Sequence, residues 1–312
     1  MRVSHAALAS LCVAIASPAN AQSNSDFDCA ATRVGGADPV VIKTTLGETP
    51  ALVRIPSEIR KSPIVLWHGF GPPASEQALM EALPLDDVPA VKVYLGLPLF
   101  GSRAPEGGAK ELARRQQEDL ATLVFEPAVM GAAKELPAVV RALEQHGCMK
   151  HGERIGLFGF SAGGAAVLYA LAERDVRIGA AVTLNASTGL SASVEAYERA
   201  TKGSYNWTDA ARRLAQRSDA AGRAKDIAKG DPAPALLIIH GNDEAVLTPE
   251  VASTLHQALM PAYHEAMAVP RLQLILVPGL AHGWTSPGSL EALRGSIGAW
   301  FHNRQWPVGS TR

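Results

Sequence analysis

Short apolar runs alternate with helical patterns along most of the chain. The helical patterns cover residues 111–145, with breaks near Pro127 and Pro137, and residues 163–173, 249–260 and 289–303. The apolar runs that predict strands are residues 39–45, 51–55, 64–67, 91–97, 154–160, 178–184, 235–239 and 272–277. Short apolar strands that alternate with helices are typical of a parallel sheet covered on both faces. The pattern therefore predicts an α/β fold.

One stretch, residues 187–234, interrupts this alternation. It lies between two predicted strands, is longer than an ordinary crossover, and contains Trp207 and a mixed-charge helical segment at residues 210–229. We expect a small helical cap over the carboxyl edge of the sheet. The alternative is a solvated helical excursion that does not contact substrate.

The N-terminus has the pattern of an export signal. Arg2 supplies a positive charge, residues 6–16 are apolar, and Ala19-Asn20-Ala21 fits a small-x-small cleavage site. Residues 1–21 are therefore predicted to be a signal peptide, and the protein to be exported, either periplasmic or secreted. The remaining residues 22–312 then form a single α/β domain. The alternative is a short N-terminal helix that stays attached.

Composition and charge exclude several classes of protein. The chain has 312 residues, 47% of them hydrophobic, which is too apolar for a disordered protein. Lys plus Arg is 29 and Asp plus Glu is 30, a net charge of −1. This balance argues against a nucleic-acid partner and against a polybasic membrane surface. After the signal region, no segment is long and apolar enough for a membrane span.

The three cysteines are too few for a disulfide scaffold or a four-cysteine zinc site. Cys12 would leave with the signal peptide, so Cys29 and Cys148 would remain as an even pair. In an oxidising compartment these two can form one disulfide that closes a long loop. The alternative is two unrelated thiols.

A nucleophile motif follows one of the apolar strands. Gly159-Phe160-Ser161-Ala162-Gly163 has the form G-x-S-x-G, ends the strand at residues 154–160 and opens the helix at residues 163–173. In this context the serine lies on a strained strand-to-helix turn that exposes its hydroxyl above the sheet. We therefore expect Ser161 to be a catalytic nucleophile.

A serine hydroxyl needs a base, and that base needs a carboxylate to hold its tautomer. His282 directly follows the last strand, whereas the other histidines fit this position less well. Asp243 and Glu244 both follow the strand at residues 235–239. Either of these acids can serve, and the order serine, acid, histidine is the one expected around such a nucleophile motif.

An oxyanion hole would complete the site. Ala162, the residue after the nucleophile, would donate one backbone N–H group. The second would come from the glycine-rich loop after the strand at residues 64–67, where the N–H group of Phe70, or alternatively of Gly71, would point inward. We interpret His68 as a residue that braces this loop.

Together these motifs resemble the α/β-hydrolase superfamily, most closely its dienelactone-hydrolase-like and prolyl-oligopeptidase-like esterases. The resemblance runs from about Pro39 to Trp306. It is carried by His68-Gly69-Phe70-Gly71, Gly159-Phe160-Ser161-Ala162-Gly163, His240-Gly241 with its following acids, and Gly279-Leu280-Ala281-His282-Gly283. The resemblance implies an eight-stranded, mostly parallel sheet with helices on both faces and the triad at the carboxyl ends of the strands.

The sequence departs from these families in two places. Dienelactone hydrolases carry a cysteine in the motif, and Ser161 stands here, which argues against their lactone chemistry. Family members commonly have the acid four residues after the histidine of the His-Gly pair. That position is Glu244, with Asp243 one residue early, although aspartate is the commoner acid.

These residues predict a serine hydrolase that cleaves small or medium esters through an acyl-enzyme intermediate. Its partner would be a small-molecule ester, and no cofactor and no metal is expected. Trp207 and Trp284 lie near the predicted site loops and are candidates for substrate binding, or else packing residues. The alternative functions are a prolyl-oligopeptidase-like peptidase or amidase and a non-catalytic binding protein of the same fold.

Overall fold

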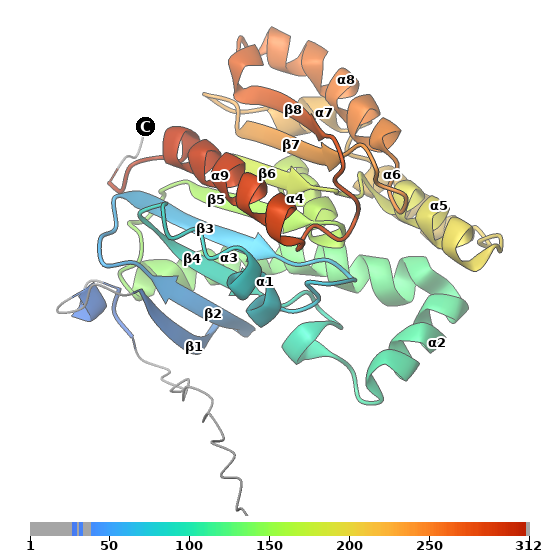
Figure 1. Cartoon of the computed structure of the whole chain (residues 1–312), viewed down its shortest axis with the longest axis horizontal. Coiled ribbons are helices and arrows are strands. Elements are labelled where there is room, and N and C mark those ends of the chain that lie inside the picture. Colours follow the sequence, from blue (N-terminus) through green and yellow to red (C-terminus); the bar gives the residue numbers. More distant parts are fainter. Residues whose placement is uncertain (1–26, 30, 34–38, 310–312) are drawn as a thin grey trace, which may run out of the picture.

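The computed structural model describes residues 27–29, 31–33 and 39–309, so the predicted signal peptide lies outside the described residues. A single sheet with the strand order β1-β2-β4-β3-β5-β6-β7-β8 runs through the molecule (Figure 1). Its strands are β1 (Val40–Leu46), β2 (Thr49–Ile55), β3 (Lys61–Trp67), β4 (Ala90–Leu95), β5 (Ile155–Phe160), β6 (Ile178–Leu184), β7 (Ala235–Gly241) and β8 (Leu272–Val277).

Most neighbouring strands pair in parallel, which confirms the predicted eight-stranded, mostly parallel sheet. β1 pairs with β2 and β2 with β4 in antiparallel register, and every later pair is parallel. The central strands β4, β5, β6 and β7 are buried along their whole length. This burial explains why they appear in the sequence as continuous apolar runs rather than as alternating ones.

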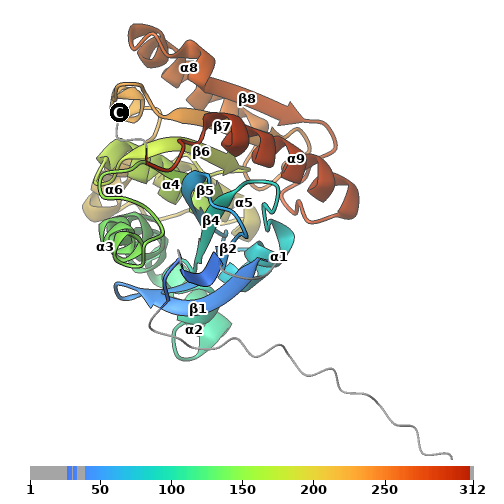
Figure 2. The ribbon, with the colours of Figure 1, turned by 90° about the vertical axis from the view of Figure 1, so that its left-hand side faces the viewer.

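Helices cover both faces of the sheet, as predicted (Figure 2). One apolar layer packs α1 and α9 against the sheet, and the larger layer on the other face contains α3, α4 and α8. Among the described residues, no helix is long and apolar enough to cross a membrane. The helices are η1 (Ala31–Arg33), α1 (Glu76–Ala82), η2 (Gly101–Arg103), α2 (Gly108–Leu120), η3 (Ala121–Met130), α3 (Gly131–Gln145), α4 (Ala162–Glu173), α5 (Leu190–Thr201), α6 (Asp209–Ser218), α7 (Ala224–Ala228), α8 (Pro249–Glu265), η4 (Val269–Arg271) and α9 (Pro287–Arg304).

The helical run through α2, η3 and α3 differs from its prediction. Its break lies at Asp119, with φ −161° and ψ 98°, where the carboxylate accepts hydrogen bonds from the amides of Ala121 and Thr122. Pro127 lies inside the wider π-helical turns of η3, and Pro137 lies inside α3. Each proline removes one backbone N–H donor, but the helical turns continue past both, so neither proline ends the run.

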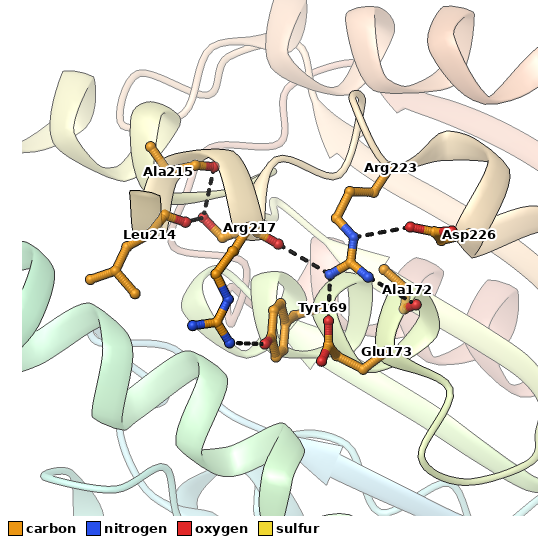
Figure 3. Close-up of polar contacts among 9 residues, drawn as sticks. Tyr169, Ala172, Glu173, Leu214, Ala215, Arg217, Arg223 and Asp226 are labelled. Carbon is orange, nitrogen blue, oxygen red and sulfur yellow. Dashed lines mark hydrogen bonds and ion pairs between the residues drawn. The ribbon is translucent and has the colours of Figure 1, made fainter. Parts of the chain in front are cut away.

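The predicted insertion between β6 and β7 folds into the helices α5, α6 and α7. Arg223, just before α7, donates hydrogen bonds to the Glu173 carboxylate at 2.6 Å and to the carbonyl oxygens of Ala172 and Arg217, each at 3.1 Å (Figure 3). Arg217 in turn donates to the hydroxyl of Tyr169 at 3.2 Å (Figure 3). These contacts attach the insertion to α4, the helix that begins at the predicted nucleophile.

Cys29 and Cys148 form a disulfide, which resolves the two alternatives left open by the sequence. Their Cα atoms are 5.0 Å apart. Beside the bridge, the ring of Phe27 stacks on His146 at 4.1 Å, and the amide of Cys29 donates to the His146 carbonyl. The first described residues are thus attached to the end of α3.

Reduction of this disulfide is expected to destabilise the fold. The bond links residues 119 positions apart, so its loss should lower the free energy of unfolding by about 3–5 kcal/mol. Urea unfolding with and without a reductant measures the change. The double variant Cys29→Ser/Cys148→Ser is the matched control, because a reductant should not destabilise it further. An unchanged midpoint for the reduced wild-type protein would contradict the expectation.

Candidate active site

Ser161 occupies a tight turn between β5 and α4. Its backbone has φ 53° and ψ −116°, a strained conformation for a residue with a side chain. A Cβ atom at Gly159 would lie 2.1 Å from the Gly163 carbonyl oxygen, and one at Gly163 would lie 2.4 Å from the His68 carbonyl oxygen. Both positions flanking the serine therefore require glycine, which explains the spacing of the motif.

Replacing Gly159 by alanine is expected to cost about 3 kcal/mol or more, because the new methyl group would meet backbone atoms that cannot move aside. Thermal or urea unfolding measures this loss. Gly295→Ala is the matched control, since a Cβ atom there meets nothing within 4 Å and lies on the exposed side of α9. That control should be neutral or slightly stabilising. Equal stability of both variants would show that the turn tolerates a side chain at residue 159.

His282 and Glu244 form a hydrogen-bonded pair close to the turn. The Nδ1 atom of His282 lies 2.7 Å from Oε2 of Glu244, whose side chain is fully buried. The other carboxylate oxygen of Glu244 accepts hydrogen bonds from the amides of Val246 at 2.6 Å and Leu247 at 3.0 Å. Asp243, the competing acid in the sequence, is exposed. Of the two candidate acids, the structure brings Glu244 to the imidazole.

The environment of Glu244 keeps its carboxylate ionised. Burial by itself raises the pKa of this group, but the hydrogen bonds from His282 and from the Leu247 and Val246 amides outweigh it, so the pKa is lowered from its usual value. An ionised carboxylate accepts a hydrogen bond from the Nδ1–H group of His282, which leaves Nε2 without a proton and able to act as a base.

Asn185 positions the loop that carries His282, a role that was not predicted from the sequence. Its side-chain amide donates to the Ala281 carbonyl oxygen at 2.9 Å, and its carbonyl oxygen accepts from the Gly241 amide at 2.9 Å. It therefore ties the residue before His282 to the end of β7. The sequence signal that could have indicated this role is the polar residue, Asn185, directly after the apolar run of β6.

The glycine-rich loop after β3 lies against Ser161. A Cβ atom at Gly69 would come within 2.8 Å of the Ser161 Cβ atom. His68 braces the loop, because its Nε2 atom accepts from the Leu97 amide at 3.1 Å while Nδ1 donates to the Gly69 carbonyl oxygen at 2.7 Å. Nε2 can accept a hydrogen bond only on a neutral ring, and burial favours that form because it lowers the pKa of His68. Phe70 follows directly.

Ser161 and His282 face one cavity of about 290 Å³, and Phe70, Gly71 and Ala162 line it as well. Helix α2 contributes Gln116 and Leu120 to its wall, and α5 contributes Ser193, Ala196, Tyr197 and Ala200. None of the described residues that line it is Asp, Glu, Lys or Arg. The cavity therefore suits uncharged groups.

No hydrogen bond joins the Ser161 hydroxyl to the imidazole among the interactions of the described residues, although both side chains line the cavity. Catalytic hydrogen bonds of this kind are often long without substrate and tighten when it binds.

The sequence profile described as "Prolyl oligopeptidase family" matches residues 131–304, more than half of the chain. The protein belongs to the prolyl oligopeptidase family. The matched segment begins at α3. It includes β5 with the turn at Ser161 and the loops that carry Glu244 and His282. As a member of this family with an α/β-hydrolase fold, the protein is a serine hydrolase.

Solved structures show the same fold at low sequence identity. A protein of Thermus thermophilus is 20% identical, with a TM-score of 0.64 over 85% of this chain and 99% of that one. Carboxyl esterase 2 of Tuber melanosporum is 18% identical, with a TM-score of 0.56 over 86% of each chain. An acylaminoacyl peptidase of Pyrococcus horikoshii is 13% identical, with a TM-score of 0.58 over 88% of this chain and 43% of that one. This chain thus spans less than half of that peptidase. Among curated proteins, no sequence matches this chain significantly.

Two predicted pocket residues of this prolyl oligopeptidase family member lie elsewhere. Trp284 is fully buried and packs its ring against Phe160 at 5.8 Å, within the apolar layer beneath α9. Trp207 packs edge-on against Tyr205 at 5.2 Å. Neither lines the cavity of Ser161, so their placement as substrate-binding residues is corrected to packing.

In the part of the chain that the structure describes, no group of three or more His, Cys, Asp or Glu side chains is arranged to hold a metal ion.

Proposed function

We propose that this prolyl oligopeptidase family member is a carboxylesterase that cleaves uncharged esters of small or medium size. The observation that carries the proposal is the cavity shared by Ser161 and His282, whose lining combines apolar groups with neutral polar ones. Its volume of about 290 Å³ is at the lower end of ligand-binding cavities. The likeness to a protein named carboxyl esterase 2 supports an ester substrate.

The proposed reaction is acyl transfer to water. Ser161 attacks the ester carbonyl while Nε2 of His282 takes the proton from the hydroxyl, and Glu244 stabilises the resulting imidazolium. The N–H groups of Ala162 and Phe70 hold the developing oxyanion. His282 then protonates the departing alcohol, and a water molecule repeats the sequence to release the acid.

The insertion formed by α5, α6 and α7 would act as the cap of this site. Helix α5 supplies one wall of the cavity, and Arg199 on α5 donates to the Val246 carbonyl oxygen of the acid loop at 2.7 Å. In this proposal the cap limits the length of the substrate, because α5 faces α2 across the cavity.

Hydrolysis of two matched substrate series tests the proposal. Esters of p-nitrophenol with acyl chains of graded length are expected to give a kcat/KM at least about 100-fold above peptidyl p-nitroanilides, which release a related chromophore. A fluorophosphonate should label the protein at Ser161.

The competing function is peptide or amide hydrolysis, which the family name and the likeness to an acylaminoacyl peptidase favour. Faster hydrolysis of the anilides than of the esters would support it and contradict the esterase proposal. No turnover and no label would contradict both.

We also propose that the protein is exported after removal of residues 1–21. The signal pattern supports this, and so does the Cys29–Cys148 disulfide, because such bonds persist in oxidising compartments. N-terminal sequencing of the protein from an expressing bacterium should give Gln22 as the first residue. A first residue at Met1 in protein from the cytosol would overturn the proposal.

A further inference from the structure

A second cavity, of about 250 Å³, opens at the opposite edge of the sheet from Ser161. It lies at the amino ends of β5, β6 and β7, between the end of α4 and the connection from α7 to β7. Four of its lining residues are basic: Arg154, Arg174, Arg177 and Lys229. The nucleophile turn lies at the carboxyl ends of the same strands, so the two cavities are distinct.

Positive charge is concentrated at this second cavity. Asp231 is the one acidic residue among the described residues that line it. In the described part of the chain, none of the four basic residues forms an ion pair with a carboxylate. Other arginines do, including Arg54 and Arg103. Because the whole chain carries a net charge of −1, this excess is a local feature.

Arg154 lines this cavity and is nearly buried. The side chain donates to the carbonyl oxygens of Asp231 at 2.7 Å and Pro232 at 3.3 Å, and its guanidinium lies 4.7 Å from the centre of the Trp306 ring. The residue is 7% exposed, and its Nε atom is buried without a hydrogen-bond partner. A buried guanidinium with no counter-ion is costly, so an anion here would offset an existing penalty.

The surrounding charges add to this penalty. Burial lowers the pKa of Arg154, and repulsion from Arg177 and Arg271 lowers it further, while Asp231 opposes the shift. Arg174 and Arg177 are exposed at the rim, and Arg177 uses one of its guanidinium donors on the Gly152 carbonyl oxygen at 2.8 Å. Guanidinium groups bind the oxygens of phosphate in pairs, and a lysine adds a point charge.

We propose that this cavity is a binding site for a phosphate group, carried by a small molecule or by a lipid headgroup. The site is independent of the proposed esterase reaction, since it lies at the other edge of the sheet. Bound phosphate would offset part of the positive charge of the four basic groups and link the connection before β7 to the end of α4. Stabilisation of the fold, rather than a change in turnover, is the expected consequence.

Titration calorimetry with sodium phosphate, at an ionic strength held constant with sodium chloride, tests the proposal. We expect saturable binding to the wild-type protein and a higher unfolding temperature in phosphate than in chloride. Arg174→Gln/Arg177→Gln should weaken the binding about tenfold or more. Asp231→Asn should tighten it, because the variant removes the one carboxylate at the site. All variants should keep the wild-type rate of ester hydrolysis and the wild-type circular dichroism.

The matched control removes two charges elsewhere. Arg212→Gln/Arg213→Gln changes two exposed residues of α6 that do not line the cavity. Absence of saturable binding to the wild-type protein would overturn the proposal, as would equal weakening in both double variants. Sedimentation with vesicles of phosphatidylglycerol, with phosphatidylcholine vesicles as reference, separates the two sources. Binding to the anionic vesicles that is lost in Arg174→Gln/Arg177→Gln assigns the phosphate to a lipid, and phosphate binding without vesicle binding assigns it to a soluble molecule.

Discussion

Replacing Ser161 by alanine is expected to lower the kcat of ester hydrolysis by about 10⁵-fold or more. The serine oxygen forms the covalent bond to the acyl group in the proposed reaction, and alanine offers no nucleophile in its place. The oxyanion donors and the cavity would remain, so a small residual rate above that of water is expected. Steady-state hydrolysis of p-nitrophenyl butyrate measures the loss, and fluorophosphonate labelling should disappear with it.

Ser193→Ala is the matched control for this experiment, because Ser193 lines the same cavity from α5 and its hydroxyl is hydrogen-bonded to Ser187. This variant should lose no more than about tenfold in kcat/KM, the scale of one neutral hydrogen bond. Both variants should unfold at temperatures close to that of the wild-type protein. A Ser161→Ala variant that retains activity within tenfold would contradict the proposed mechanism.

The turn around Ser161 could be predicted from the sequence because its geometry is local. Gly159, Ser161 and Gly163 lie within five consecutive residues, and the conflict that excludes a side chain at Gly159 arises inside that same segment. The positions of the buried strands could be predicted for a similar reason. A strand in the middle of a two-sided sheet has to be apolar at nearly every position, and β5, β6 and β7 are.

The residues of the cavity wall could not be predicted from the sequence, because the wall depends on packing between segments that are far apart in the chain. Gln116 on α2 and Tyr197 on α5 both line the cavity, and the kink at Asp119 lies three residues after Gln116. The Tyr205 hydroxyl donates a hydrogen bond to that same Asp119 carboxylate, which joins the insertion to the kink. Proximity to a site loop in sequence was a poor guide for Trp284, since its ring turns away into the apolar layer under α9.

The choice between two adjacent acids also needed the structure. One residue of difference in a loop decides which carboxylate faces the protein interior, and no periodic pattern constrains that choice. Glu244 is buried against two backbone amides and His282, while its neighbour Asp243 points to solvent.

Replacing Glu244 by glutamine is therefore expected to lower kcat about 10⁴-fold, the cost typical of neutralising the acid of such a triad. The amide has nearly the same shape, but it removes the charge that stabilises the imidazolium and can hold the ring in the wrong tautomer. Asp243→Asn is the matched control and should change kcat by less than about threefold, since the side chain is exposed. The reverse result, with Asp243→Asn inactive and Glu244→Gln active, would assign the acid to Asp243.

The pH dependence of stability gives Glu244 a second readout that does not depend on turnover. Its native pKa lies below the usual value of 4.5, so the ionised carboxylate stabilises the fold at pH values above 4.5. That contribution is lost as the pH falls through the native pKa. The free energy of unfolding should therefore differ between wild-type protein and Glu244→Gln at pH 7, and the difference should shrink toward pH 3. Urea unfolding across this range measures it, and a difference that stays constant would show that the hydrogen bonds to Glu244 do not favour its charged form.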